Sequence, residues 1–69
     1  MSKRNFYVFF RFNSQYENKF AVVQAKKIDD ARTIALQKFG VWNVGGVTGQ
    51  EEYALNKIKL HGYTEVKEQ

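Results

Sequence analysis

The chain has 69 residues, so it forms at most one domain, and a chain of this length removes only about 60% of its unfolded surface from water when it folds. Its composition is globular, and the absence of cysteine excludes disulfides and thiolate zinc sites. The net charge of +4 is concentrated in residues 1–28, where six basic residues face Glu17 alone. Such an excess favours anionic partners, but on a small protein it is more often ordinary solubility charge.

The first two elements predicted along the chain form a β-hairpin. Residues 5–12 are rich in aromatic and β-branched side chains, which is typical of a strand. A polar stretch over residues 13–18 predicts a loop, and residues 19–27 predict the second strand. We expect Ala21, Val23 and Ala25 to face the core, because Gln24 and Lys26 on the alternate face could not be buried without partners.

The register of this hairpin follows from matching the two apolar faces. Placing both on one side requires Phe12 opposite Lys19 or Ala21. With Phe12 opposite Lys19, Phe9 pairs with Val22 and Arg11 with Phe20.

Two helices and two short strands follow the hairpin. Asp29 or Asp30 predicts the N-cap of a helix over residues 31–39 that is closed by Gly40. Residues 41–44 predict a short strand or extended connection. Capping-box spacing between Thr48 and Glu51 predicts a second helix that ends before Gly62, and residues 63–66 predict a closing strand.

The expected fold is therefore a single α+β domain over residues 1–69, with the element order ββαβαβ and flexible ends at residues 1–4 and 67–69. Its small sheet is mostly antiparallel, and both helices pack on one face. The predicted core consists of Phe6, Val8, Phe10, Phe12, Ala21, Val23, Ala25, Ile34, Ala35, Phe39, Ile58 and Val66. Trp42, the only tryptophan, is expected to fill a gap in the core rather than to bind a ligand.

Catalytic and cofactor chemistry find little support in this sequence. His61 falls in the last turn of a predicted helix, and the pairs Asp29/Asp30 and Glu51/Glu52 are explained by helix capping. Residues 45–49 are glycine-rich and precede a helix, an arrangement that can bind phosphate, but they lack the P-loop ending. We expect no enzyme activity, no cofactor and no metal. With no membrane-length apolar run, no signal-peptide pattern and no cysteine, we also expect no membrane contact and a cytoplasmic location.

The outer face of the hairpin is the candidate functional surface. Its predicted partner-binding residues are Tyr7, Phe9, Arg11, Phe20, Val22 and Lys26, with Lys3 and Arg4 as auxiliary cations. Three interpretations compete for this face. It contacts protein, either a partner or a second copy; it binds single-stranded nucleic acid by base stacking; or residues 41–47 or the last strand cover it. We favour the first interpretation, in which the protein is a small non-enzymatic accessory module that binds protein through this face. Binding of single-stranded nucleic acid by the same face is the alternative.

Overall fold

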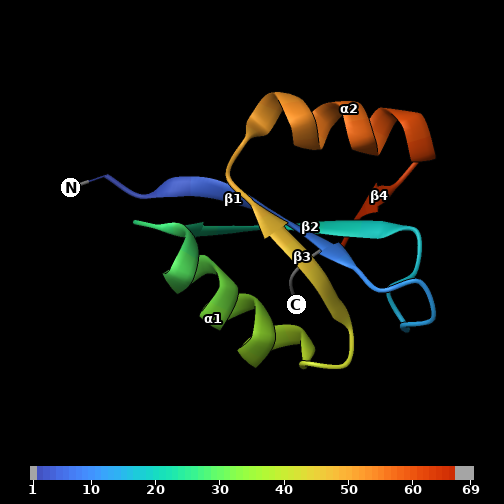
Figure 1. Cartoon of the computed structure of the whole chain (residues 1–69), viewed down its shortest axis with the longest axis horizontal. Helices are drawn as coiled ribbons and strands as arrows, with labels where there is room; N and C mark the ends of the chain where they lie inside the picture. Colours follow the sequence, from blue (N-terminus) through green and yellow to red (C-terminus); the bar gives the residue numbers. More distant parts are fainter. Residues whose placement is uncertain (1, 67–69) are drawn as a thin grey trace.

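The computed structural model describes residues 2–66 and arranges them in three layers. The elements are β1 (Arg4–Phe10), β2 (Lys19–Ala25), α1 (Ile28–Phe39), β3 (Val44–Thr48), α2 (Glu51–His61) and β4 (Thr64–Glu65). The sheet lies in the middle, with α2 above it and α1 below it in the view of Figure 1. The predicted α+β class and the order ββαβαβ are confirmed. Residues 67–69, which we expected to be flexible, lie outside the described residues, whereas Arg4 already belongs to β1 and pairs with Ala25.

The strand order is β3-β1-β2-β4, and the sheet is mostly antiparallel as predicted. β1 pairs antiparallel with both β2 and β3, whereas β2 and β4 are parallel. Strands β2, β3 and β4 therefore all run in the same direction, and each helix connects two parallel strands. The third strand starts three residues later than predicted, because Val41, Trp42 and Asn43 form a turn and the glycine-rich segment itself is β3.

The prediction that both helices pack on one face is wrong. α1 packs on the face that carries Phe6 and Val8, and α2 packs on the face that carries Tyr7 and Phe9. α1 connects β2 to β3, which lies at one edge of the sheet, and α2 connects β3 to β4, which lies at the other edge. Crossovers between parallel strands are nearly always right-handed. Two crossovers of the same hand that run in opposite directions place their helices on opposite faces.

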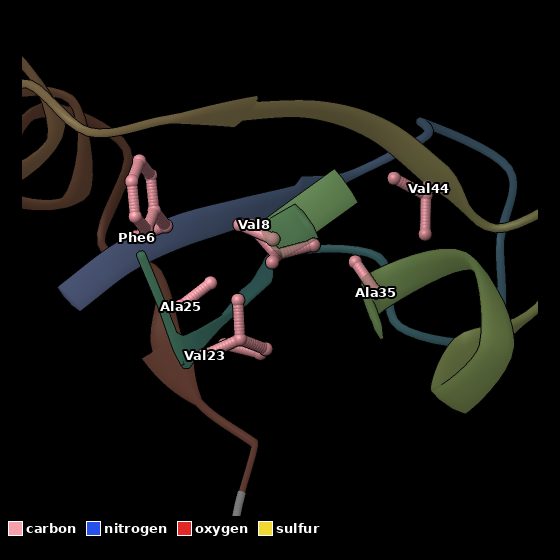
Figure 2. Packing of buried hydrophobic residues seen from close by; sticks show 8 residues of the cluster. Phe6, Val8, Val23, Ala25, Ala35 and Val44 are labelled. Carbon is pink, nitrogen blue, oxygen red and sulfur yellow. The ribbon is translucent and has the colours of Figure 1, made fainter. Parts of the chain in front are cut away.

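The main core lies between the sheet and α1 (Figure 2). Phe6 and Val8 are its largest fully buried side chains, and the small residues Ala31 and Ala35 let the helix backbone approach the sheet. The predicted faces of both strands are confirmed, since Ala21, Val23 and Ala25 lie in this core. The predicted register is wrong by two residues, because Phe9 pairs with Phe20 rather than with Val22. A shift by two residues keeps every side chain on its face, so the burial pattern alone could not detect it.

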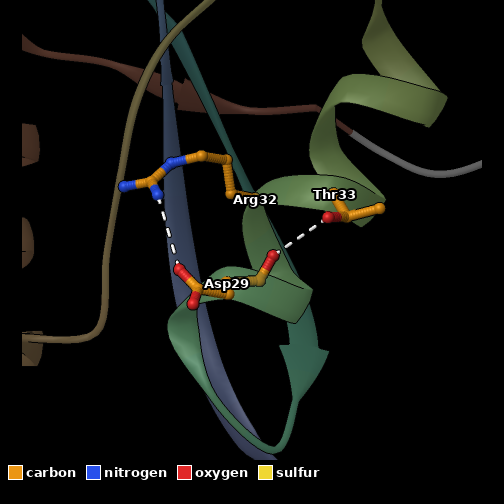
Figure 3. Close-up of polar contacts among 3 residues, drawn as sticks. All are labelled: Asp29, Arg32 and Thr33. Atoms are coloured by element: carbon orange, nitrogen blue, oxygen red, sulfur yellow. Dashed lines mark hydrogen bonds and ion pairs between the residues drawn. The ribbon is translucent and has the colours of Figure 1, made fainter.

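The ends of the helices differ from prediction in detail. α1 begins at Ile28 with Lys27 as N-cap, so Asp29 lies in the first turn and caps nothing. Its carboxylate instead lies 3.7 Å from the Arg32 guanidinium, and its backbone carbonyl accepts a 3.1 Å hydrogen bond from the Thr33 hydroxyl (Figure 3). α2 has Gln50 as N-cap without a side-chain cap, so the predicted capping box is absent. Gly62 adopts the left-handed conformation expected of a helix C-cap.

Candidate functional site

The predicted hairpin face exists as a cluster, but it is covered. Tyr7 and Phe9 lie together with the half-buried Phe20 and Val22, and α2 packs on them through Ala54 and Ile58. Tyr7 is only 8% exposed and Phe9 only 7%. The expectation of an exposed aromatic face is therefore wrong for these two rings. The covering element is α2, not residues 41–47.

Aromatic and polar contacts hold α2 and the segment after it against this face. The Phe9 ring centre lies 5.8 Å from that of Tyr63, and the Lys57 ammonium lies 5.0 Å from the centre of the Phe9 ring. Burial raises the pKa of the Tyr7 phenol, and the charge of Glu51 and a hydrogen bond to its carboxylate raise it further. The Tyr7 hydroxyl is thus a protonated group that links β1 to the first turn of α2.

The predicted basic residues do not surround this cluster. Lys3 and Lys26 line a shallow depression beside the start of α1, together with Asp30. The Arg4 guanidinium lies 5.1 Å from the centre of the Phe6 ring. Arg11 is at the opposite end of β1, where its Nε donates a 3.2 Å hydrogen bond to the Val44 carbonyl. The sequence grouped these cations by strand alternation, but the structure divides them between two ends of the sheet.

Exposed apolar side chains lie instead at the end of the sheet where β1 finishes and β3 begins. Phe12 is 78% exposed, Trp42 82% and Val41 57%, so the predictions that Phe12 and Trp42 belong to the core are wrong. The Arg11 amide donates a 2.7 Å hydrogen bond to the Asn43 carbonyl, which places the two neighbouring residues, Phe12 and Trp42, at the same end. We call Phe12, Val41 and Trp42 the aromatic corner.

The aromatic corner was missed because hydrophobicity alone indicates burial. The sequence signal that could have revealed it is Gly40, because a glycine at a helix end indicates a turn after it. In the structure Gly40 ends α1 with φ +91°, and Val41 and Trp42 lie in the turn that follows. The Asn43 side-chain amide donates to the Phe39 carbonyl, and the Asn43 backbone amide donates to the Gly40 carbonyl, which closes a tight turn. A tryptophan inside a tight surface turn has few neighbours that could cover it.

A groove of about 320 Å³ separates α2 from β3. Phe9 and Phe10 line it together with Tyr53 and Lys57, and its β3 side is the segment 45–48. Residues 45–48, part of the glycine-rich segment considered for phosphate binding, form strand β3. They are not a loop that leads into a helix, so the arrangement that would bind phosphate is not present. Tyr53 and Lys57 also line the outer surface of α2, with Leu60 and His61.

His61 occupies the last turn of α2 as predicted, and its ring stacks on Tyr63 at 5.1 Å between ring centres. Within residues 2–66, no three His, Asp or Glu side chains gather closely enough to hold a metal ion. Neither helix in this part of the chain has the length and hydropathy needed to cross a bilayer. The absence of enzyme activity stays a prediction.

Comparison with known proteins yields no relative: no protein-family model, curated protein or solved structure matches this chain.

Proposed function

We propose that the protein is a small non-enzymatic binding module that contacts another protein through the aromatic corner. The observation that carries this proposal is the exposure of Trp42, 82%, at the end of the sheet where Phe12 is also exposed. Large apolar side chains grouped on a surface mark interaction sites, and tryptophan and arginine are the most frequent energetic anchors of protein interfaces. Arg11 adds a guanidinium whose orientation is fixed by its bond to the Val44 carbonyl.

Packed aromatic rings support the backbone next to the corner. Phe10, directly before Arg11, packs on Tyr16 and Phe39 with ring centres 4.7 and 5.0 Å away. Tyr16 and Phe39 in turn meet edge to face at 5.2 Å. This three-ring cluster anchors the loop after β1 to the end of α1. A partner would therefore meet side chains whose backbone is already ordered, which lowers the entropic cost of binding.

Affinity capture tests this proposal when the wild type is compared with the double variant Phe12→Ala/Trp42→Ala. Leu55→Ala is the matched control, because Leu55 is an exposed apolar residue on α2, away from the corner. We expect the control to retain the protein captured by the wild type and the double variant to lose it. In the purified complex, the emission of Trp42 should move to shorter wavelength as the indole leaves water. Equal capture by the double variant would exclude the aromatic corner as the binding surface.

Single-stranded nucleic acid is the alternative ligand. Two exposed rings next to Arg11, in a chain whose basic excess lies in residues 1–28, offer stacking surfaces and a phosphate contact. Titration of a fluorescent single-stranded oligonucleotide at two salt concentrations tests it. Binding that weakens with salt and is lost in Arg11→Ala would favour nucleic acid over protein. No binding at low salt would reject the nucleic-acid alternative.

The cytoplasmic location stays a prediction.

A further inference from the structure

The strand β3 lies at an edge of the sheet and carries neither a charged residue nor a proline, although its register against β1 shifts at Gly45, the extra residue between the pairs Phe9–Gly46 and Phe10–Val44. Among residues 2–66 its only strand partner is β1. Natural proteins usually guard such an edge with lysine, proline or an inward-pointing charge. Here residues 39–50, which include all of β3, contain no charged residue and no proline. The edge is therefore open to pairing with another strand.

Packing among residues 2–66 does not require one glycine of this strand. A side chain at Gly45 would lie 3.3 Å from the backbone of Phe9 and Phe10, and one at Gly49 would lie 2.8 Å from the Phe6 ring. At Gly46 nothing lies within 4 Å, and its φ is one that any residue adopts. Glycine weakens a strand, and within a strand it often marks a place where another backbone approaches closely. Gly46 is the central residue of β3.

The helix α2, which packs on Tyr7 and Phe9 of β1, also presents a partly exposed stripe whose Lys57 contacts the rings of Phe9 and Tyr53. Tyr53, Asn56, Lys57 and Leu60 follow the i, i+3, i+4, i+7 spacing of one helix face. Tyr53 and Lys57 line the groove beside Gly46, so this stripe lies on the β3 side of α2. Leu60 is 79% exposed and Tyr53 52%. The strand edge and this stripe, in which Tyr53 and Leu60 are the large apolar side chains, therefore belong to the same side of the molecule.

We propose that this side binds a second copy of the chain: the two β3 strands pair antiparallel about a two-fold axis at Gly46, and the two α2 stripes face each other above them. The pair would form one continuous sheet across both copies. The contact is separate from the aromatic corner, so either proposal can fail while the other stands.

Complementary charges at the two ends of α2 favour a second copy as the occupant. Two chains of net charge +4 repel each other, and the uncharged segment 39–50 is where that repulsion is least. α2 carries Glu51 and Glu52 in its first turn and Lys59 and His61 in its last. A two-fold axis makes the two α2 helices antiparallel, so the acidic end of each lies toward the basic end of the other. The dipoles of the two antiparallel helices also attract each other.

The spacing of the layers is compatible with this contact. Adjacent strands are about 4.8 Å apart, so helices above the two β1 strands would be three strand spacings, about 14 Å, apart. A helix with its side chains is about 10–12 Å across, so large side chains are needed to close the remaining gap. Tyr53 and Leu60 are the large side chains of the stripe. The absent side chain at Gly46 leaves room for the two Tyr53 rings above the axis.

Sedimentation equilibrium over a range of concentrations tests the proposal with two variants of equal charge. Gly46→Lys places two ammonium groups opposite each other at the axis, where like charges destabilise strand pairing. Leu55→Lys adds the same charge on the far side of α2 and is the control. We expect wild type and control to approach twice the chain mass of 8.1 kDa, with association at least about tenfold weaker in Gly46→Lys. A wild type that stays monomeric overturns the proposal, as does a dimer that Gly46→Lys leaves intact.

Amide hydrogen exchange of the wild type tests the same contact without a substitution. Backbone amides that point outward from β3 exchange freely in a monomer and are protected in the pair. We expect exchange in β3 to slow as concentration rises, while exchange at the other sheet edge, β4, stays constant. Protection of β4 instead, or no change in β3 on association, would place the contact elsewhere and refute the pairing. Protection of β3 in a monomer by an added extended peptide would assign the edge to a different partner.

Discussion

Replacing Phe9 by alanine separates the covered face in this structure from the exposed face that the sequence suggested. Phe9 is 7% exposed, and its ring contacts both Tyr63 and the Lys57 ammonium. Truncation of a buried phenylalanine costs about 3–5 kcal/mol through lost transfer energy and the cavity that remains. A 69-residue domain has a total stability of about 3–10 kcal/mol, so Phe9→Ala removes a third of it or more.

Phe12→Ala is the matched control, because the same change is made three residues later on a ring that is 78% exposed. We expect its free energy of unfolding to stay within about 0.5 kcal/mol of the wild type. Urea unfolding followed by circular dichroism gives both values. Phe9→Leu, with an expected loss of about 1–2 kcal/mol, keeps the comparison measurable if Phe9→Ala does not fold. Equal, small losses in Phe9→Ala and Phe12→Ala would show that α2 does not cover the β1 face.

Two further predictions concern Tyr7 and Gly49. The raised pKa of Tyr7 means that above about pH 10 the unfolded chain loses this proton while the folded chain retains it, so stability falls as pH rises. Urea unfolding at pH 9 and pH 11 should show a smaller loss in Tyr7→Phe than in wild type, and identical losses would contradict the buried phenol. Gly49→Ala should cost about 1–3 kcal/mol, because its methyl group would lie 2.8 Å from the buried Phe6 ring. Gly46→Ala, which meets nothing, should cost no stability in the monomer, and equal effects of the two changes in thermal unfolding would refute this difference.

The local features of this protein follow from short stretches of sequence. Alternation of apolar and polar residues fixed which faces of β1 and β2 share a side, and Gly40 and Gly62 marked the ends of the two helices. These features depend on neighbours within a few residues, for which propensity and periodicity are direct physical signals. The same signals grouped the apolar set Tyr7, Phe9, Phe20 and Val22, but they did not show that α2 covers it.

Strand order is what only the tertiary structure decided. β3 joins β1 at one edge and β4 joins β2 at the other, so the crossover through α2 runs opposite to the crossover through α1. With one preferred hand for both, α2 must lie on the second face, where it buries Tyr7 and Phe9. The hairpin sequence contains no information about which edge a later strand will join. That choice covered the predicted surface, and it left Trp42, Phe12 and the edge of β3 as the surfaces available to a partner.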